Sequence, residues 1–312
     1  MEKALSNILW FPLNFISSLD EQGGKYGYTF FGGVDLVKHI FEKSMMYLLM
    51  IIFTIFFLFP IYWAITMSFK TPGQIFVTPP EFFPSSFHLD NYVDIFSKGG
   101  AGIYFLNSLI VSITTTVVAV LFATMAGYGF SRYKFKGKYT ALYTVIIVRM
   151  IPGLVYTIPF YIIYQNLGML NSLTGLVISY ITFSLPLAIW LFMGFYDQIP
   201  TEVFESAIID GCNDYGVFRH IAIKLVLPGI VVASILIFLG AWNEFGLALV
   251  LLFTDAKKTL PIGINGLIVY QEDTPFGSLA AAGTIAMLPA IILSLTTQKF
   301  IVRGLTDGAV KG

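Results

Sequence analysis

The sequence predicts an all-α integral membrane protein with six transmembrane helices and a helix–turn–helix loop on the cytoplasmic face. Charged residues make up 12% of the 312 residues, half the share of about 25% in an ordinary soluble domain. The mean hydropathy is +0.79. The chain also contains six mostly apolar segments of about 20 residues or more, the length that crosses a bilayer. Too little polar surface remains to coat a soluble globule of this size.

The predicted spans follow the charge-poor apolar stretches of the chain. The first two contain no charge, the third contains Arg149, and the fifth contains Glu244. In chain order the spans cover residues 45–68, 103–130, 139–164, 172–196, 226–253 and 276–297. The predicted transmembrane domain, 45–302, therefore lies between an N-terminal segment, 1–44, and a C-terminal tail, 303–312.

The distribution of Lys and Arg orients the spans, because cytoplasmic loops carry an excess of both. An even number of spans puts the two termini on one side, and most of the 18 Lys and Arg lie there. The opposite side carries only Lys70, Lys98, Lys257 and Lys258. We therefore expect a multi-pass protein of the inner (cytoplasmic) membrane with both termini in the cytoplasm. The segment 1–44 is expected to be cytoplasmic or to lie along the membrane interface.

The longest cytoplasmic connection, residues 197–225, has the pattern of two short helices. Pro200 suits a helix start, Gly211 suits a left-handed helix stop, and Asn213 or Asp214 can cap a second helix. Each helix is expected to have an apolar face, made of Val203, Phe204, Ala207 and Ile208 in the first and of Tyr215, Phe218, Ile221 and Ala222 in the second. On pattern alone this unit is either a compact knob for a partner or a loop packed against its own bundle.

Several kinds of chemistry find no support in the sequence. The chain has no phosphate-binding loop of the Gly-x-x-x-x-Gly-Lys-Ser/Thr type, and we therefore expect that it is not an enzyme. The three histidines, His39, His88 and His220, lack metal-ligand spacing, and the single cysteine excludes an internal disulfide. We expect no metal and no cofactor in this chain. The net charge of zero gives no reason to expect nucleic-acid binding.

The loop residues Glu205-Ser206-Ala207, Asp210-Gly211, Phe218, Ile221 and Pro228 resemble the "EAA" coupling loop of binding-protein-dependent ABC importer permeases. Ser206 and Cys212 replace alanines that are usual in the family, and Lys224 replaces a common proline. The resemblance to carbohydrate permeases extends through Phe59–Trp63, Asn107–Leu109, Ala126–Gly137, Ala241–Phe245 and the tail Arg303–Gly312, which is similar to that of the smaller membrane subunit of the maltose importer.

The resemblance implies a coupling role for Glu205, Ser206, Ala207, Asp210, Gly211, Phe218 and Ile221, with further contacts from Gly308 and Lys311 in the tail. The implied partners are a second homologous permease, two ATPase subunits that hold ATP and Mg, an extracytoplasmic sugar-binding protein and membrane lipid. In the maltose system the larger permease supplies most sugar contacts. The implied function is import of a sugar or oligosaccharide coupled to ATP hydrolysis on other chains.

Two charges inside predicted spans, Arg149 and Glu244, remain without an assigned role, and intramembrane charges are costly and often functional. At about 1.5 Å per residue in straight helices, Arg149 would lie about 16 Å and Glu244 about 27 Å from the cytoplasmic side. The two could line a pathway, pair with each other, or join a structural network with Asn243. An ion-coupled secondary transporter that uses them, or an ABC permease for a non-sugar solute, is the alternative function.

Overall fold

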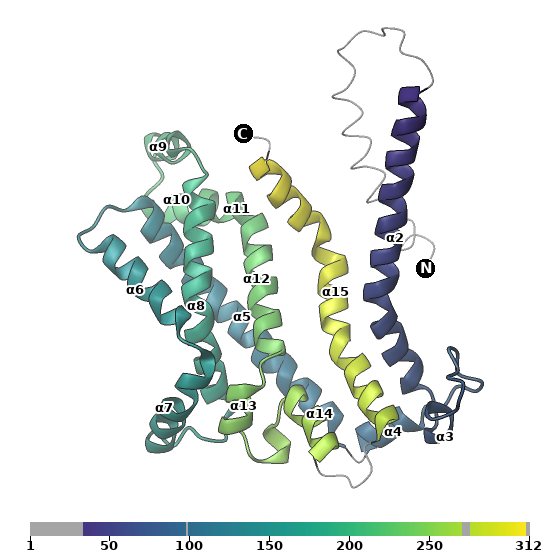
Figure 1. Ribbon diagram of the computed structural model, residues 1–312. Helices are drawn as coiled ribbons and strands as arrows, with labels where there is room; N and C mark the ends of the chain where they lie inside the picture. The colour runs from purple at the N-terminus through teal and green to yellow at the C-terminus, as the bar shows by residue number, and fades with distance from the viewer. Residues whose placement is uncertain (1–33, 98, 270–274, 310–312) are drawn as a thin grey trace. The chain divides into compact units, whose positions relative to one another are not determined.

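The computed structural model describes residues 34–97, 99–269 and 275–309 (Figure 1). Within these ranges every regular element is a helix and none is a strand, which confirms the predicted all-α class. The chain divides into two compact units, Met1–Pro60 and Ile61–Gly312. Most of the predicted interfacial segment, residues 1–33 of 1–44, lies outside the described residues.

The helix α2 covers Val34–Ser68 and corresponds to the first predicted span. Its stretch Phe41–Ser68 is long and apolar enough to cross a membrane. Every side chain from residue 41 to residue 60 is exposed within the chain. So large an apolar surface is unstable against water, whereas lipid tails are as apolar as the side chains themselves. The exposed surface of α2 is therefore that of a helix in a bilayer.

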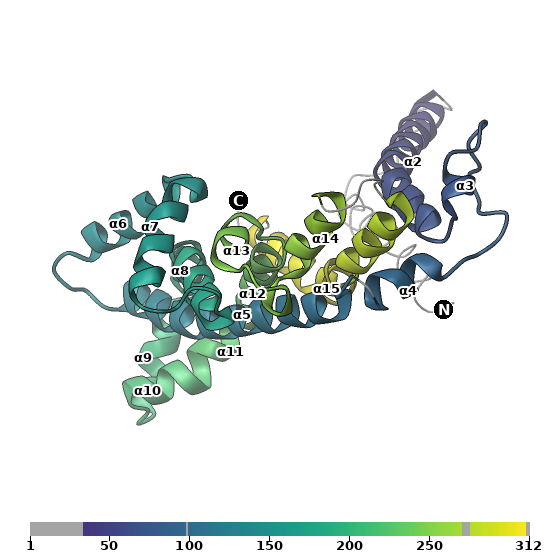
Figure 2. The ribbon, with the colours of Figure 1, turned by 90° about the horizontal axis from the view of Figure 1, so that it is seen from below.

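The second unit is built around α5 (Ala101–Arg132), α8 (Leu173–Asp197) and α12 (Leu227–Trp242), with α15 (Phe276–Ala309) against α12. Figure 2 shows α5 running alongside α8 and α12. Small residues allow this close approach. A Cβ added to Gly127 of α5 would lie only 2.6 Å from the Cβ of Phe192 on α8. Small residues at such contacts are typical of membrane helices, which gain little from the hydrophobic effect between spans.

Two of the predicted spans are not straight. The third is broken at Ile151–Pro152 into α6 (Lys138–Met150) and α7 (Gly153–Asn166), at an angle of 102°. Proline disfavours the helical conformation of the residue before it, which explains where the break falls. The described residues thus contain four helices long enough to cross a membrane, or up to six spans if each bent pair counts as one.

The fifth predicted span, 226–253, is bent at its start and broken inside. At the end beside the knob the segment Asp214–Leu225 meets α12 at 73°. At its other end α12 stops at Trp242, and a separate short helix, α13 (Gly246–Leu251), follows. The predicted continuous helix over 226–253 is therefore wrong in detail, because the chain turns at Asn243–Phe245.

The connections opposite the knob contain short helices of their own, namely α3 (Pro72–Ile75), α4 (Asp90–Ser97), the 3-10 turn η2 (Asp255–Lys257) and α14 (Leu260–Val269). Asn107 and Ser108 of α5 hold the start of α14 in place. The Asn107 amide donates to the carbonyls of Ala256 and Lys258 at 3.0 and 2.9 Å. The Ser108 hydroxyl accepts from the N–H of Leu260 at 2.7 Å. These two residues therefore have a structural role at the entrance to α5.

Candidate functional site

The loop 197–225 folds as a knob of short helices at one end of the second unit (Figure 1). The helix α9 covers Thr201–Ile209 after Pro200, and Gly211 follows with a φ of +90°, a conformation that L side chains rarely adopt. The amide of Gly211 donates to the Ile208 carbonyl at 3.0 Å and so closes the turn. The helix stop predicted at Gly211 and the start predicted at Pro200 therefore appear in the structure.

The second arm of the knob begins at Asn213, whose side-chain oxygen accepts from the N–H of Gly216 at 2.7 Å. The cap is thus Asn213, one of the two predicted candidates. The helix α10 (Asp214–Val217) continues into one π-helical turn, η1 (Phe218–Ala222), and then into α11 (Ile223–Leu225). A π turn holds more residues than an α turn and so rotates the helix face that follows it.

Arg132, the last residue of α5, connects the knob to the helix bundle. Its guanidinium lies 3.9 Å from the ring centroid of Phe204 in α9. The same group donates to the backbone carbonyls of Tyr196 and Ile199 at 2.5 and 2.8 Å. A planar guanidinium can do both at once, because its edge donates hydrogen bonds while its face packs on a ring. Arg132 therefore joins α5, the end of α8 and α9 at one point.

An aromatic cluster fills the space beside Arg132. The ring of Tyr128 packs against those of Tyr196, Phe204 and Phe218, with centroids 5.0–6.2 Å apart. Next to it, the hydroxyl of Tyr133 donates to the Asp214 carboxylate at 3.2 Å. Burial, together with that carboxylate, raises the pKa of Tyr133 above its ordinary value, so its hydroxyl remains a donor at neutral pH. The knob is thus attached to the bundle through both arms.

The buried face of the knob differs from the predicted one. Phe204, Ala207 and Ala222 are buried as expected, whereas Val203, Ile208 and Tyr215 are exposed. In the second arm Val217 takes the buried position expected for Tyr215, and Phe218 and Ile221 are half-buried against the same core. The π turn changes the register between α10 and the residues that follow it, so a face drawn for one regular α-helix fails in the second arm, whereas Val203 and Ile208 lie in α9, outside its influence.

The predicted coupling residues therefore fall into two groups. Ala207, Phe218 and Ile221 pack inside this chain, so their contacts are with their own bundle. Glu205, Ser206, Asp210 and Gly211 are exposed on the outer side of the knob. Two apolar residues that sequence reasoning did not assign to the outer side lie with them, Ile208 and Ile209, and Ile209 is 85% exposed.

Glu244 occupies the break between α12 and α13. Its carboxylate accepts from the backbone N–H groups of Leu247 and Ala248 at 2.8 and 3.2 Å and from the hydroxyl of Tyr180 on α8 at 2.5 Å. The first N–H groups of a helix have no partner within the helix, and the positive end of the helix dipole favours a negative charge. Glu244 therefore serves as the acceptor for the start of α13.

Arg149 lies at the end of α6 and lines a cavity of about 430 Å³ together with Glu244. The other lining residues that matter here are Thr157, Tyr180 and Ser184. The depths of about 16 and 27 Å assumed straight helices, so they do not hold for a chain that bends after α6. In the bent chain Arg149 and Glu244 line the same cavity. They do not form an ion pair, and the guanidinium has no hydrogen-bond partner among the residues that the structure describes.

Two other predicted contributions lie elsewhere. Asn243 donates to the Leu239 carbonyl of its own helix at 2.9 Å and lines a different cavity, so the expected network with Glu244 is not formed. In the tail, α15 extends through Gly308 to Ala309, whereas Lys311 lies outside the described residues. Over the described ranges, no group of three or more His, Cys, Asp or Glu could hold a metal ion.

Comparison with protein families gives one match, over residues 119–307, to the family described as binding-protein-dependent transport system inner membrane component. The matched range covers more than half of the chain. It includes α8, the knob, α12 and most of α15, which are the elements that build both candidate sites.

Several similar proteins are described as permeases for sugars or oligosaccharides. The trehalose transport system permease protein SugB of Mycobacterium tuberculosis is 36% identical over 82% of this chain and 93% of its own length. The trehalose/maltose transport system permease protein MalG of Thermococcus litoralis is 30% identical over 88% of this chain and 99% of its own length. The arabinooligosaccharides transport system permease protein AraQ of Bacillus subtilis is 32% identical over 83% of this chain.

A chain of a bacterial ABC transporter involved in the import of the acidic polysaccharide alginate has a similar fold. It aligns with a TM-score of 0.73 over 87% of this chain and 99% of its own, at 20% sequence identity. At that level of identity the likeness concerns the fold alone.

We predict that Glu244→Ala destabilises the protein, because it leaves two backbone N–H groups of α13 without an acceptor away from water. Each buried group left unpaired costs about 1–3 kcal/mol. Tyr180→Phe is the matched control: it removes one donor and leaves the carboxylate with its two N–H partners, for a loss of about 1 kcal/mol. Thermal unfolding of the purified protein in detergent, followed by tryptophan fluorescence, measures both. An unfolding temperature of Glu244→Ala equal to that of the parent would contradict this role.

Proposed function

The chain belongs to the binding-protein-dependent transport system inner membrane components, and we propose that it is the permease subunit of an ABC importer that carries a sugar or an oligosaccharide. The observation that carries the proposal is the exposed knob around Gly211, attached rigidly to the bundle by Arg132. The trehalose, maltose and arabinooligosaccharide permeases among its relatives support a sugar as the solute.

The ion-coupled alternative has less support. A proton or ion relay needs Glu244 to have free acceptor sites, but its carboxylate is occupied by Tyr180 and by the start of α13. The family match and the sugar permeases among the relatives favour the importer over this alternative and over a non-sugar solute.

In the proposed mechanism, the outer side of the knob docks into an ATPase subunit. Glu205, Ser206 and Asp210 supply polar contacts, and the exposed Ile209 supplies an apolar anchor in a partner cleft. The inner residues Ala207, Phe218 and Ile221 act differently, because they fix the knob to its own bundle. A rigid element that is docked in a partner transmits rigid-body motion. We propose that the outer residues bind the ATPase and that the inner residues keep the knob rigid on its bundle, so that motion of the ATPase moves the bundle.

We propose the remaining partners on the same basis. A second homologous permease, two ATPase subunits and an extracytoplasmic sugar-binding protein complete the importer, with ATP and Mg on the ATPases. The membrane domain 45–302 would have both termini in the cytoplasm, where the segment 1–44 begins and the tail 303–312 ends. The tail, through Gly308 and Lys311, would add a second contact to the ATPases.

We propose that the cavity beside Glu244 is part of the sugar pathway. Three polar side chains that line it, Arg149, Thr157 and Ser184, make no hydrogen bond to other residues in the described part of the chain. The volume of about 430 Å³ is within the range of small-molecule sites, about 300–1,000 Å³. Unpaired donors beside the aromatic rings of Tyr180 and Phe183 suit a hydroxyl-rich ring with apolar faces. Asn243 stays outside this cavity.

Purification of the complex after expression of the chain with its operon tests the function. We expect native mass spectrometry to find this chain with one other permease and two ATPase copies. In proteoliposomes, uptake of trehalose, maltose or arabino-oligosaccharides should require ATP and a binding protein. Uptake by this chain alone, driven by an ion gradient, would contradict the importer and support the secondary transporter.

We predict that Gly211→Pro uncouples ATP hydrolysis from uptake. Proline is fixed near a φ of about −65° and has no N–H, so it can neither adopt the turn nor donate to Ile208. Sugar uptake per ATP hydrolysed should fall about tenfold or more, the effect of about 1.4 kcal/mol of lost docking energy. Gly137→Pro is the control, because Gly137 also has a positive φ, +83°, but lies outside the knob. Equal coupling in the two variants would contradict the role of the knob.

A labelling experiment tests the cavity. In a Cys212→Ser background the chain has no other cysteine, so Thr157→Cys and Ser184→Cys can be modified singly with a charged methanethiosulfonate. We expect modification of both, slowed by the sugar that the complex imports. Thr182→Cys on α8 is the control, because Thr182 is exposed away from the cavity and should not react from lipid. Modification that sugar does not slow would contradict a place in the pathway.

A further inference from the structure

The segment between α3 and α4, residues 76–89, which we call the aromatic loop, turns its aromatic side chains outward. Phe83 is 75% exposed and Phe87 is 74% exposed. The other exposed large apolar residues of the loop are Phe76, Val77, Phe82 and Leu89. Surface apolar residues are usually scattered singly, so a contiguous set of this kind marks a surface that water does not cover.

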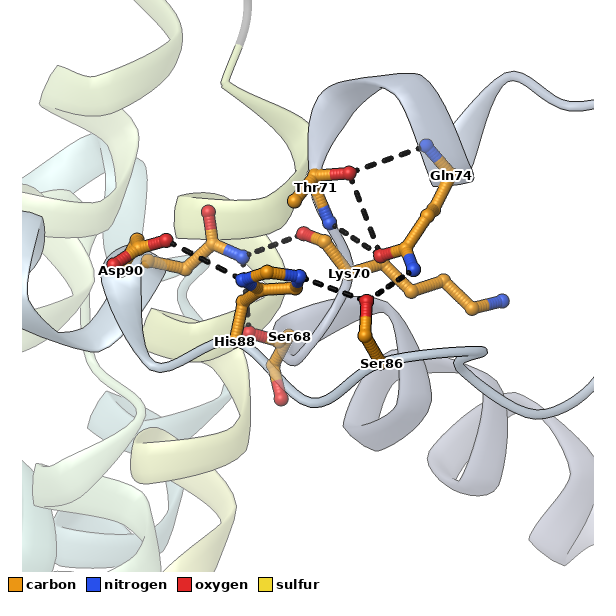
Figure 3. Close-up of polar contacts among 8 residues, drawn as sticks. Ser68, Lys70, Thr71, Gln74, Ser86, His88 and Asp90 are labelled. Carbon is orange, nitrogen blue, oxygen red and sulfur yellow. Dashed lines mark hydrogen bonds and ion pairs between the residues drawn. The ribbon is translucent and has the colours of Figure 1, made fainter.

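The polar groups of the same region turn toward one another (Figure 3). Thr71 and Gln74 form a capping box, and the Gln74 amide donates to the hydroxyls of Ser85 and Ser86 at 2.8 and 2.9 Å. Ser86 in turn pairs with His88 at 2.8 Å. These side chains satisfy part of their hydrogen bonding among themselves, which lowers the cost of placing the loop next to lipid headgroups.

The ammonium of Lys70, which lies close to the aromatic loop, is also buried and bonded within the chain. It is 1% exposed, and its ammonium donates to the Glu81 carbonyl at 2.5 Å and lies 4.7 Å from the ring centroid of Trp63. Within the loop the only acidic residue is Glu81, which is half-buried. The loop contains no Lys or Arg, and the carboxylate exposed at its end is that of Asp90, which lies 3.7 Å from the imidazole of His88.

The loop folds back along the end of α2. The hydroxyl of Tyr62 donates to the Phe82 carbonyl at 2.6 Å. The ring of Tyr62 also meets that of Phe83, and the ring of Trp63 meets that of Phe82, at centroid distances of 5.8 and 6.1 Å. Tyr62 precedes the end of α2 at Ser68 by six residues. Phe82 and Phe83 therefore lie about 9 Å back from the helix end, at about 1.5 Å per residue.

This position defines a depth in the bilayer. The apolar stretch Phe41–Ser68 has 28 residues, so it is about 42 Å long, and a bilayer with its headgroups is about 40–45 Å thick around a core of about 30 Å. With Ser68 at the membrane surface, a point about 9 Å inward lies where headgroups meet acyl chains. Aromatic side chains are enriched at that boundary.

We propose that the aromatic loop inserts Phe82, Phe83 and Phe87 into the boundary between lipid headgroups and acyl chains and anchors the end of α2 there. The occupant is lipid for two reasons. The loop adjoins a helix whose stretch Phe41–Ser68 is long and apolar enough to cross a membrane, and the exposed side chains of the loop are mostly large and apolar, with no Lys or Arg among them. The polar side chains of the loop bond to one another and so can lie at the headgroups.

Spin labels on the full complex in nanodiscs of phosphatidylethanolamine and phosphatidylglycerol test this proposal. In the Cys212→Ser background, Phe83→Cys and Phe87→Cys carry the label. Two calibration sites bracket them: Ile55→Cys, exposed in the middle of α2, and Ala256→Cys, exposed in the connection before α14. Collision rates with molecular oxygen, which concentrates in lipid, and with a water-soluble nickel chelate give the depth of each label.

We expect the oxygen-to-nickel ratio at residues 83 and 87 to exceed that at residue 256 several-fold and to stay clearly below that at residue 55, as a position at the boundary requires. A ratio equal to that at residue 256 would place the loop in water and overturn the proposal. Low collision rates with both reagents would also overturn it, because they would show that a protein partner covers the loop. All these sites are exposed, so the labels do not disturb the core of the fold, and the result does not depend on which solute the complex carries.

Discussion

The constraint on which the rest of this structure depends is that a helix broken inside a membrane must still satisfy the hydrogen-bonding groups that the break releases. Glu244 meets that constraint where α12 ends and α13 begins, by accepting from Leu247 and Ala248. Tyr180 adds a third donor and ties the break to α8. A cavity lies beside the break. Glu244, the charge to which the sequence analysis assigned no role, accepts the hydrogen bonds that the break would otherwise leave unmade.

A second charge solves a related problem at the end of the bundle beside the knob. Arg132 satisfies two carbonyls where the chain leaves α8, those of Tyr196 and Ile199, and packs its flat face on Phe204. One side chain thus closes the end of a span and supports the first helix of the knob. The rigidity that the proposed docking requires originates in this residue.

The sequence predicted those features that depend on composition and on local backbone preference. Apolar length located the spans, and Gly211 marked the elbow, because few other residues adopt its φ. Features that depend on contacts far apart in the chain were missed. Pro152 indicates that the helix breaks there, but it does not indicate the angle of 102° between the two parts. No residue near Arg149 in the sequence indicates that Arg149 shares a cavity with Glu244. The π turn at Phe218–Ala222 likewise has no sequence signal, so the predicted faces of the second arm were partly wrong.

The two sites are connected by α8. Its end leads into the knob, and Arg132 of α5 ties the two together, because it donates to the Tyr196 carbonyl and packs on Phe204. Its middle meets the cavity, since Tyr180 donates to Glu244. Tyr180 and Tyr196 are 16 residues apart, about 24 Å along one helix. Under the proposed docking, a displacement of the knob that moves α8 relative to α12 would move the Tyr180 hydroxyl relative to the start of α13, and the cavity that they line would change shape.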